Sequence, residues 1–172
     1  MAIDIRAAVL EDVPELARLH AEVLRETYNG ILTQAKASDE TRQAQWRGQL
    51  ERADATNFVL VAEDDQKQIA GFAAGRQPKP SVKTLFPEYH GELDKIYLWS
   101  QYQKQGVGRR LVARVAEQFA RAGILSLLVM THPKNTARQF YERLGAQKIW
   151  EDDGNVVYGW ADLTPLLENK DK

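Results

Sequence analysis

Seven consecutive residues combine two glycines with amide and cationic side chains. They read Gln103-Lys104-Gln105-Gly106-Val107-Gly108-Arg109, and they stand between a strand-like and a helix-like segment. Glycine lets a backbone approach a ligand closely, and the first turn of a helix directs N–H groups at an anion. The pattern is therefore typical of a phosphate or pyrophosphate site. A tight strand-to-helix turn without any ligand would use the same two glycines.

Two nucleotide-binding motifs do not fit this loop. A dinucleotide fingerprint needs a third glycine where this chain has Leu111, and a Walker loop needs Gly-Lys-Ser/Thr after its first glycine. Neither requirement is met. The phosphate that we expect here therefore belongs to another kind of molecule.

The elements around the loop follow from the spacing of apolar residues. Val107, Leu111, Val115 and Phe119 repeat every four residues, which predicts an amphipathic helix over 107–122. We expect strands at 3–6, 58–62, 68–76, 92–98, 124–130, 146–150 and 156–160, and further helices opening at 11–14, over 38–53 and over 135–144. The segment 77–90 is expected to be a long irregular loop. This order predicts one mixed α/β (α+β) domain over 1–167, with a frayed charged tail at 168–172.

The composition excludes several classes of protein. The 172 residues carry a net charge of -1, so no strong positive field draws nucleic acid or anionic lipid to the chain. There is no cysteine, and the three histidines lack metal-ligand spacing, so no metal site is expected. No apolar run approaches the roughly 18 residues of a membrane span, and the N-terminus lacks a secretory core. We expect a cytoplasmic protein.

Two motifs in register resemble the GNAT superfamily of acyl-CoA-dependent N-acetyltransferases. The first is Gln103-x-x-Gly106-x-Gly108, and the second is Ala137-x-x-Phe140-Tyr141-Glu142-Arg143-Leu144-Gly145. The segment 26–32 is also similar to the exit of the first helix in many bacterial members. The resemblance implies a mostly antiparallel sheet of six or seven strands flanked by four helices. It also implies transfer of an acetyl group from acetyl-CoA to a primary amine through a tetrahedral intermediate, without a metal.

The resemblance assigns a donor site to this chain. In the family the loop binds the pyrophosphate of coenzyme A, the preceding strand pairs with the pantetheine arm, and one strand N–H stabilises the oxyanion. The residues implied here are Ile96, Tyr97, Leu98, Gln103, Lys104, Gln105, Gly106, Val107, Gly108, Arg109, Asn135 and Tyr141.

Asn135 departs from the family pattern. The motif places an asparagine three residues before the alanine, and Lys134 occupies that position here. Either residue remains a candidate for the contact with coenzyme A.

The resemblance also implies catalytic roles. Tyr141 matches the tyrosine that protonates the leaving thiolate, although a tyrosine there would also suit a helix packed in the core. Glu92 lies four residues before Ile96, so strict alternation would place both on one face of the strand, and that offset matches a glutamate base in histone-acetylating members. Asp94 is a second candidate for the base. Water chains without a single essential base are the third possibility.

The acceptor site in this fold is formed by the exit of the first helix, the long loop and the last hairpin. From these segments we expect Glu26, Tyr28 and Tyr89 to bind the substrate. Aromatic rings with carboxylates suit a small cationic amine, and a peptide or protein amine is the alternative. A coenzyme A-binding regulator without activity and an interaction module are the rival classes. A homodimer is compatible with the family. The motifs identify the donor and leave the acceptor open.

Overall fold

The computed structural model describes residues 2–28 and 38–168. In these ranges the chain forms one seven-stranded sheet in the order β1-β2-β3-β4-β5-β7-β6. Neighbouring strands are antiparallel except for the parallel pair β4 and β5, so the mostly antiparallel sheet expected from the sequence is confirmed. The strands are β1 (Ile3–Ala7), β2 (Phe58–Asp64), β3 (Ile69–Arg76), β4 (Gly91–Leu98), β5 (Leu127–Thr131), β6 (Gln147–Glu151) and β7 (Val156–Trp160).

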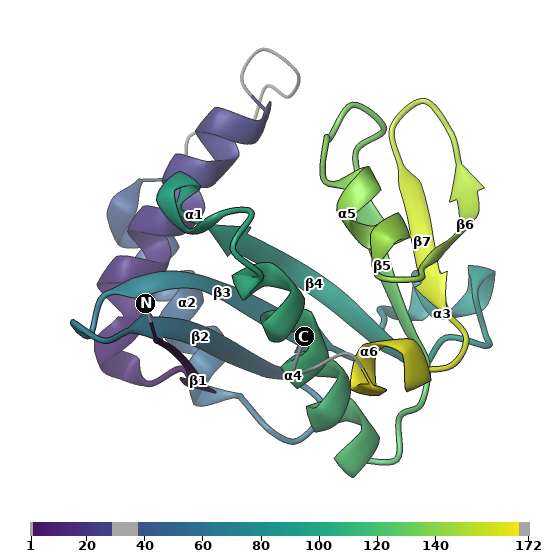
Figure 1. The fold of residues 1–172 in the computed structure, drawn as a ribbon, viewed down its shortest axis with the longest axis horizontal. Helices are drawn as coiled ribbons and strands as arrows, with labels where there is room; N and C mark the ends of the chain where they lie inside the picture. The colour runs from purple at the N-terminus through teal and green to yellow at the C-terminus, as the bar shows by residue number, and fades with distance from the viewer. Residues whose placement is uncertain (1, 29–37, 169–172) are drawn as a thin grey trace.

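Helices cover both faces of the sheet. The described residues form α1 (Val13–Tyr28), α2 (Asp39–Glu51), α3 (Pro80–Leu85), α4 (Val107–Arg121), α5 (Arg138–Arg143) and α6 (Thr164–Glu168), with 3-10 turns η1 (Leu10–Asp12) and η2 (Ser100–Tyr102). Helix α4 packs against β2, β3 and β4 on one face, and α1 packs on β3 and β4 from the other, beside α2. Figure 1 shows α4 crossing in front of the strands.

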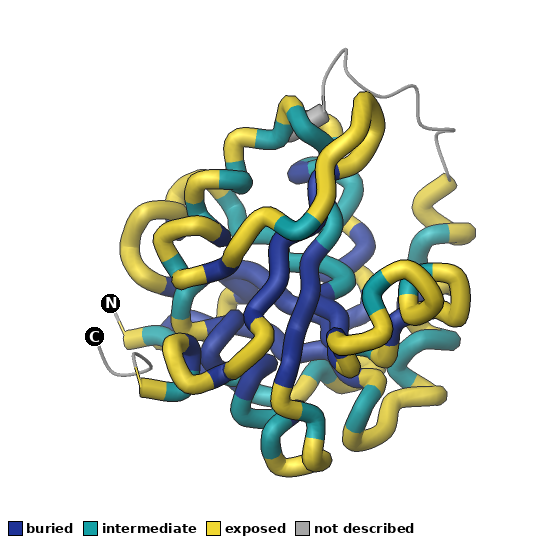
Figure 2. The backbone as a smooth tube through the Cα atoms, turned by 90° about the vertical axis from the view of Figure 1, so that its right-hand side faces the viewer, coloured by how far each residue is buried: buried dark blue, intermediate teal, exposed yellow. Residues whose placement is uncertain are grey.

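The hydrophobic core differs between the two faces. On the face of α4 it is continuous from β1 and β2 to β7 and α6, and we call it the α4-face core. On the opposite face one cluster lies under α1 and α2 and contains Trp46 and Phe72, whereas a smaller one contains Tyr89, Leu128 and Val157. Figure 2 shows the buried residues gathered at the centre of the molecule, with exposed residues in the outer turns and loops.

Strands β4 and β5 separate after a short contact. Only three residues of β4, Gly91 to Leu93, pair with β5, although β4 continues to Leu98. The two strands diverge toward the top of Figure 1, between α1 on one side and α5 on the other. The sheet therefore opens beside the second half of β4.

Four local features differ from the sequence-based expectations. The segment 77–90 contains the helix α3, which begins at Pro80, a residue that suits the first turn of a helix. Strand β5 begins only at Leu127, and Leu125 is 62% exposed. Helix α5 begins at Arg138 rather than at 135. Helix α6 was not expected, and the end of the predicted tail, 169–172, lies outside the described residues.

Candidate active site

The glycine loop combines two left-handed backbone conformations with one close packing contact. Gly106 has φ 83° and caps α4, and Lys104 has φ 59°. A Cβ on Gly106 would meet nothing within 4 Å, so it is the left-handed backbone alone that favours glycine there. A Cβ on Gly108 would lie 3.1 Å from Leu98 Cδ1 and 3.3 Å from Phe140, so close packing favours glycine at the second position.

The first turn of α4 is suited to an anion. Its N–H groups have no partners within the helix by α-helical geometry, and no acidic residue stands in this turn. Lys104 and Gln105 are exposed beside it, and Arg109 is half-buried. The structure therefore brings together the positive helix end, the left-handed loop and two cations predicted from the sequence.

The second half of β4 has backbone groups directed into the opening. Trp99 donates its backbone N–H to Ala70 on β3 at 3.0 Å, and the alternation of a strand then directs the N–H and C=O of Leu98 and Ile96 away from β3. Gln103 Nε2 donates to the Leu98 carbonyl at 3.2 Å. Tyr97 directs its side chain to the opposite face, into the core under α1 and α2. This edge runs directly to the glycine loop.

Tyr141 is placed on the same side as α4. It projects from α5 into the α4-face core and is 5% exposed. Its ring centroid lies 5.4 Å from Phe140, 6.1 Å from Tyr158 and 6.4 Å from Trp160. The tyrosine thus has the packed surroundings of a core residue, in a helix that borders the opening.

Asn135 organises the approach to α5. Its Nδ2 donates to Thr131 Oγ1 at 2.8 Å, and its Oδ1 accepts from the Ala137 N–H at 2.9 Å. These bonds connect the end of β5 to the start of α5 and account for the later start of that helix. Lys134, the alternative residue for the contact with coenzyme A, is exposed.

A β-bulge in β4 overturns the expected sharing of faces. Successive residues of β3 pair with Lys95 and then with Leu93, so Asp94 is the extra residue of the bulge. Leu93 and Ile96 consequently both pack into the α4-face core. Glu92, adjacent to Leu93, points to the opposite face. Strict alternation predicts that Glu92 and Ile96 share a face, and because of the bulge they do not.

Glu92 lies in a buried ion-pair cluster on that opposite face. Arg76 Nε donates to Glu92 Oε2 at 2.9 Å, and Arg76 Nη2 donates to Oε1 at 3.2 Å. Arg76 Nη1 also lies 3.2 Å from Asp94, which pairs with Lys95 Nζ at 2.7 Å. Burial favours a lower pKa for Arg76, but the hydrogen bond with Glu92 and the charges of Asp94 and Glu92 outweigh it and raise that pKa.

The expected acceptor residues fall partly on the same face. Tyr89 is 6% exposed and lies in the cluster with Leu128 and Val157; its ring covers Gly159, where a Cβ would come within 2.5 Å. Burial raises the pKa of the Tyr89 hydroxyl. Glu26 is exposed near the end of α1, and Tyr28 ends that helix with a side chain that lies outside the described part of the chain.

His20 is a residue of this face whose chemistry the sequence did not reveal. The apolar stripe of the first helix predicts its inward direction, but not its surroundings. Its ring stacks on Tyr97 at 5.5 Å and meets Trp46 edge-on at 5.6 Å. Its Nδ1 is buried and has no hydrogen-bond partner among residues 2–28 and 38–168.

The charge state of His20 is shifted by its environment. Burial lowers its pKa, the nearby charges of Lys95 and Arg42 lower it further, and Asp94 opposes them, which brings the pKa to about 4. His20 is therefore neutral at pH 7 and adds no charge to the face that carries the ion-pair cluster.

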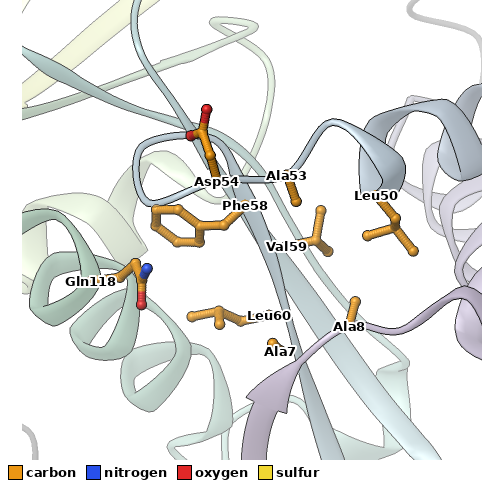
Figure 3. Close-up of a pocket in the computed structure, with 9 residues that line it drawn as sticks. All are labelled: Ala7, Ala8, Leu50, Ala53, Asp54, Phe58, Val59, Leu60 and Gln118. Carbon is orange, nitrogen blue, oxygen red and sulfur yellow. The ribbon is translucent and has the colours of Figure 1, made fainter. Parts of the chain in front are cut away.

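Two shallow hollows lie outside the opening. The first, of about 200 Å³, is bordered by β1, β2, the end of α2 and Gln118, and Figure 3 shows its mainly apolar lining around Phe58, Val59 and Leu60. Phe58 pairs with Gly75 of β3, and Gly75 pairs with Leu93, which lies in the part of β4 that is bound to β5. This hollow is therefore remote from the open edge of β4. The second, of about 310 Å³, lies between α1 and η2.

No cation site is indicated in the part of the chain that the structure describes, since it contains no group of three or more histidine, cysteine, aspartate or glutamate side chains able to hold a metal. The same residues include no helix long and apolar enough to cross a membrane.

Comparisons with known proteins agree on one family. The model of the acetyltransferase (GNAT) family matches residues 18–146. The uncharacterized N-acetyltransferase YuaI of Bacillus subtilis is 28% identical, over 95% of this chain and 96% of that protein. The PaiA N-acetyltransferase of Thermoplasma acidophilum, solved in complex with coenzyme A, is 21% identical with a TM-score of 0.77, covering 92% of this chain and 98% of that one.

A second solved structure has the same fold. It is yncA of Salmonella typhimurium with its cofactor acetyl-CoA, at 16% identity and a TM-score of 0.68, and the match covers 93% of this chain and 94% of that one.

Proposed function

This chain belongs to the acetyltransferase (GNAT) family, and on that premise we propose that it transfers an acetyl group from acetyl-CoA to the amine of a small molecule. The observation that carries the proposal is the open edge of β4. Its second half lies free of β5 and leads to a loop with a left-handed glycine and the N-terminus of α4. This arrangement offers backbone partners to a pantetheine arm and N–H groups to the pyrophosphate attached to it.

The chemistry of the donor side follows from this placement. The pantetheine arm pairs with the backbone of Ile96 and Leu98, and one of their N–H groups donates to the thioester carbonyl oxygen. The same bond stabilises the oxyanion that forms when the amine attacks. As the C–N bond forms and the C–S bond breaks, Tyr141 gives its proton to the departing thiolate, and the proton that the attacking nitrogen then loses returns to Tyr141 through water. Asn135 keeps α5, and with it Tyr141, in position at the end of β5.

The amine approaches from the face of α1 and α2 in this proposal. An alkyl ammonium group with a pKa of about 10 must lose a proton before it can attack. Glu92 and Asp94 are the carboxylates available there, and their pair accepts this proton. The side chain of Asp94 is 13% exposed and that of Glu92 only 4%, so Asp94 meets the amine first.

The acceptor class follows from the rim of this face. Glu26 is exposed near the end of α1 and provides a carboxylate that binds a cationic amine by charge. Tyr89 and Tyr28 stay the aromatic residues expected from the sequence for a cation–π contact. A peptide or protein amine is the alternative acceptor, and a coenzyme A-binding regulator without turnover is the alternative function.

Two measurements test the proposal in order. A thermal-shift titration with acetyl-CoA is expected to raise the melting temperature, because a ligand that binds only the folded state stabilises it. Release of free thiol is then measured against a panel of small amines and short peptides. No stabilisation by acetyl-CoA would contradict the donor site. Stabilisation without turnover on any amine would favour the regulator, and turnover on peptides alone would favour the alternative acceptor.

A further inference from the structure

A buried hydrogen bond connects the glycine loop to a distant turn. Tyr102, which precedes the loop, donates its hydroxyl proton to Asp64 Oδ2 at 2.7 Å. Tyr102 is 7% exposed and Asp64 is 8% exposed. Asp64 ends β2, 38 residues away in the chain, so this bond connects two separate segments.

Asp64 is itself held in one orientation. Its Oδ1 accepts from the backbone N–H groups of Gln66 at 2.9 Å and Gln68 at 2.8 Å, which closes the turn between β2 and β3. The bond from Gln68, followed by that from Tyr102, lowers the pKa of Asp64, and the bond to Asp64 raises the pKa of Tyr102. The carboxylate is thus a charged, oriented acceptor for a single hydroxyl.

The loop needs such an anchor. Lys104 holds a left-handed backbone conformation, which for a residue other than glycine costs on the order of 1 kcal/mol. The side-chain bonds of the loop itself are local: Gln103 binds the Leu98 carbonyl, and Gln105 binds the Gln101 carbonyl at 2.6 Å. They bind the loop to the adjacent end of β4 and to η2, but not to the turn between β2 and β3.

Packing supports this segment only in part. The hollow of about 310 Å³ between α1 and η2 is lined by Trp99, Gln101 and Tyr102, so the segment before the loop is not closely packed on that side. The ring of Tyr102 contributes to the α4-face core, and a phenylalanine would fill the same space. The hydroxyl is therefore not needed for this packing, and its contribution is the bond to Asp64.

We propose that Tyr102 and Asp64 are positioning residues for the donor, because their hydrogen bond holds the loop 103–108 in the conformation that binds the pyrophosphate of acetyl-CoA. This inference rests on the proposed function. Neither side chain needs to touch the ligand, since the bond acts through the backbone of the loop.

A truncated donor separates this role from a general loss of structure. S-acetylpantetheine carries the same thioester and pantetheine arm as acetyl-CoA but lacks the pyrophosphate and the nucleotide. For Tyr102→Phe we expect the KM of acetyl-CoA to rise by about tenfold, while kcat and the kcat/KM of S-acetylpantetheine stay at their wild-type values. Asp64→Asn is expected to behave in the same way, and the double variant to be no worse than the more impaired single variant.

The matched control is Asp12→Asn. Asp12 is also buried, and it accepts bonds from Arg6 and from the Val9 N–H, away from the loop. This variant is expected to melt at a lower temperature with an unchanged KM for acetyl-CoA. Equal effects of Tyr102→Phe on both donors, or no effect on either, would overturn the proposal. Failure of the wild-type protein to bind acetyl-CoA would instead overturn the proposed function.

Discussion

On the α4 side of β4 the candidate donor site consists mostly of backbone: a strand edge, a left-handed glycine and the N-terminus of a helix. On the other side, the face from which the acceptor is proposed to approach consists of side chains from several elements, with Arg76 on β3, Glu92 and Asp94 on β4 and His20 on α1. A backbone site restricts which residue types can occupy a few adjacent positions, so it leaves a motif. A site built from side chains far apart in the chain depends on how the elements pack, so it leaves none.

Removal of the acid on the donor side should give the largest effect. For Tyr141→Phe we expect kcat to fall by about 100-fold or more, because a general acid contributes roughly 10²- to 10⁴-fold. The ring remains among Phe140, Tyr158 and Trp160, so the melting temperature should change little. The control is Tyr158→Phe, which removes a hydroxyl bonded to Glu142 at 2.7 Å without touching the proposed proton transfer. An unchanged kcat in Tyr141→Phe would leave that tyrosine with a packing role alone.

The next largest effect is expected from substitutions in the ion pair of Arg76 and Glu92, on the acceptor side. Glu92→Gln is expected to lower the free energy of unfolding by about 3 kcal/mol, because it removes the charge that binds Arg76 through two bonds and leaves Arg76 with the contact to Asp94 at 3.2 Å. Arg76→Met combined with Glu92→Gln should recover most of that loss in urea unfolding. If Glu92 also accepts the proton of the amine, the kcat of the double variant should stay about 100-fold below that of the wild type.

The double variant therefore separates structure from catalysis. Full activity in it would remove Glu92 from the proton transfer. The same measurement on Asp94→Asn, which leaves the bidentate Arg76–Glu92 pair intact, would then show whether the more exposed carboxylate accepts the proton by itself.

The pH dependence of stability should distinguish the two sides further. The pKa of His20 is about 4 in the folded protein and about 6.5 when unfolded, so the unfolded state binds more protons between these values. The contribution of the neutral His20 to the free energy of unfolding is fully present above pH 6.5 and is lost as the pH falls toward 4. Relative to His20→Phe, the wild type should lose about 2 kcal/mol between pH 7 and pH 5 in urea unfolding. Equal losses in both proteins would contradict the buried neutral histidine.

The smallest effect should come from two glycines with nearly the same backbone. Gly106 has φ 83°, Gly123 has φ 79°, and a Cβ on either would meet nothing within 4 Å. Alanine at each position should therefore cost about 1 kcal/mol of stability through backbone strain alone. Only Gly106→Ala should also weaken the binding of acetyl-CoA in a calorimetric titration. Equal binding by the two variants would show that the conformation of this loop does not matter for the donor.

The sequence predicted the framework better than the directions of the side chains. Alternating and four-spaced apolar residues predicted the strands and the helix α4, and the two motifs identified the family, which the family model confirms. The last hairpin was expected from the closely spaced strands at 146–150 and 156–160, and β6 and β7 form it. These are local patterns, so they can be read from one chain.

The errors arose where a long-range contact decides the outcome. Asp94 forms a bulge because β3 pairs with Lys95 and then with Leu93. The residue types in β4 do not predict this bulge. The later start of α5 is a local exception, because Asn135 bonds with Thr131 and Ala137, which lie only four and two residues away. The partner of Tyr102 lies 38 residues away, beyond any local pattern. The roles predicted for Tyr141, Glu92 and the loop residues stay predictions until the variants above are measured.

The two faces of the sheet also differ in how they can move. The α4-face core is continuous across the sheet, whereas the opposite face has separate clusters on either side of the opening, and the β4–β5 ladder between them spans three residues. Bending of the sheet is therefore least costly about an axis through the α4-face core. We expect such bending to change the width of the face proposed for the acceptor more than the shape of the face proposed for the donor. The proposed enzyme would then take amines of different size with one arrangement of the acetyl donor.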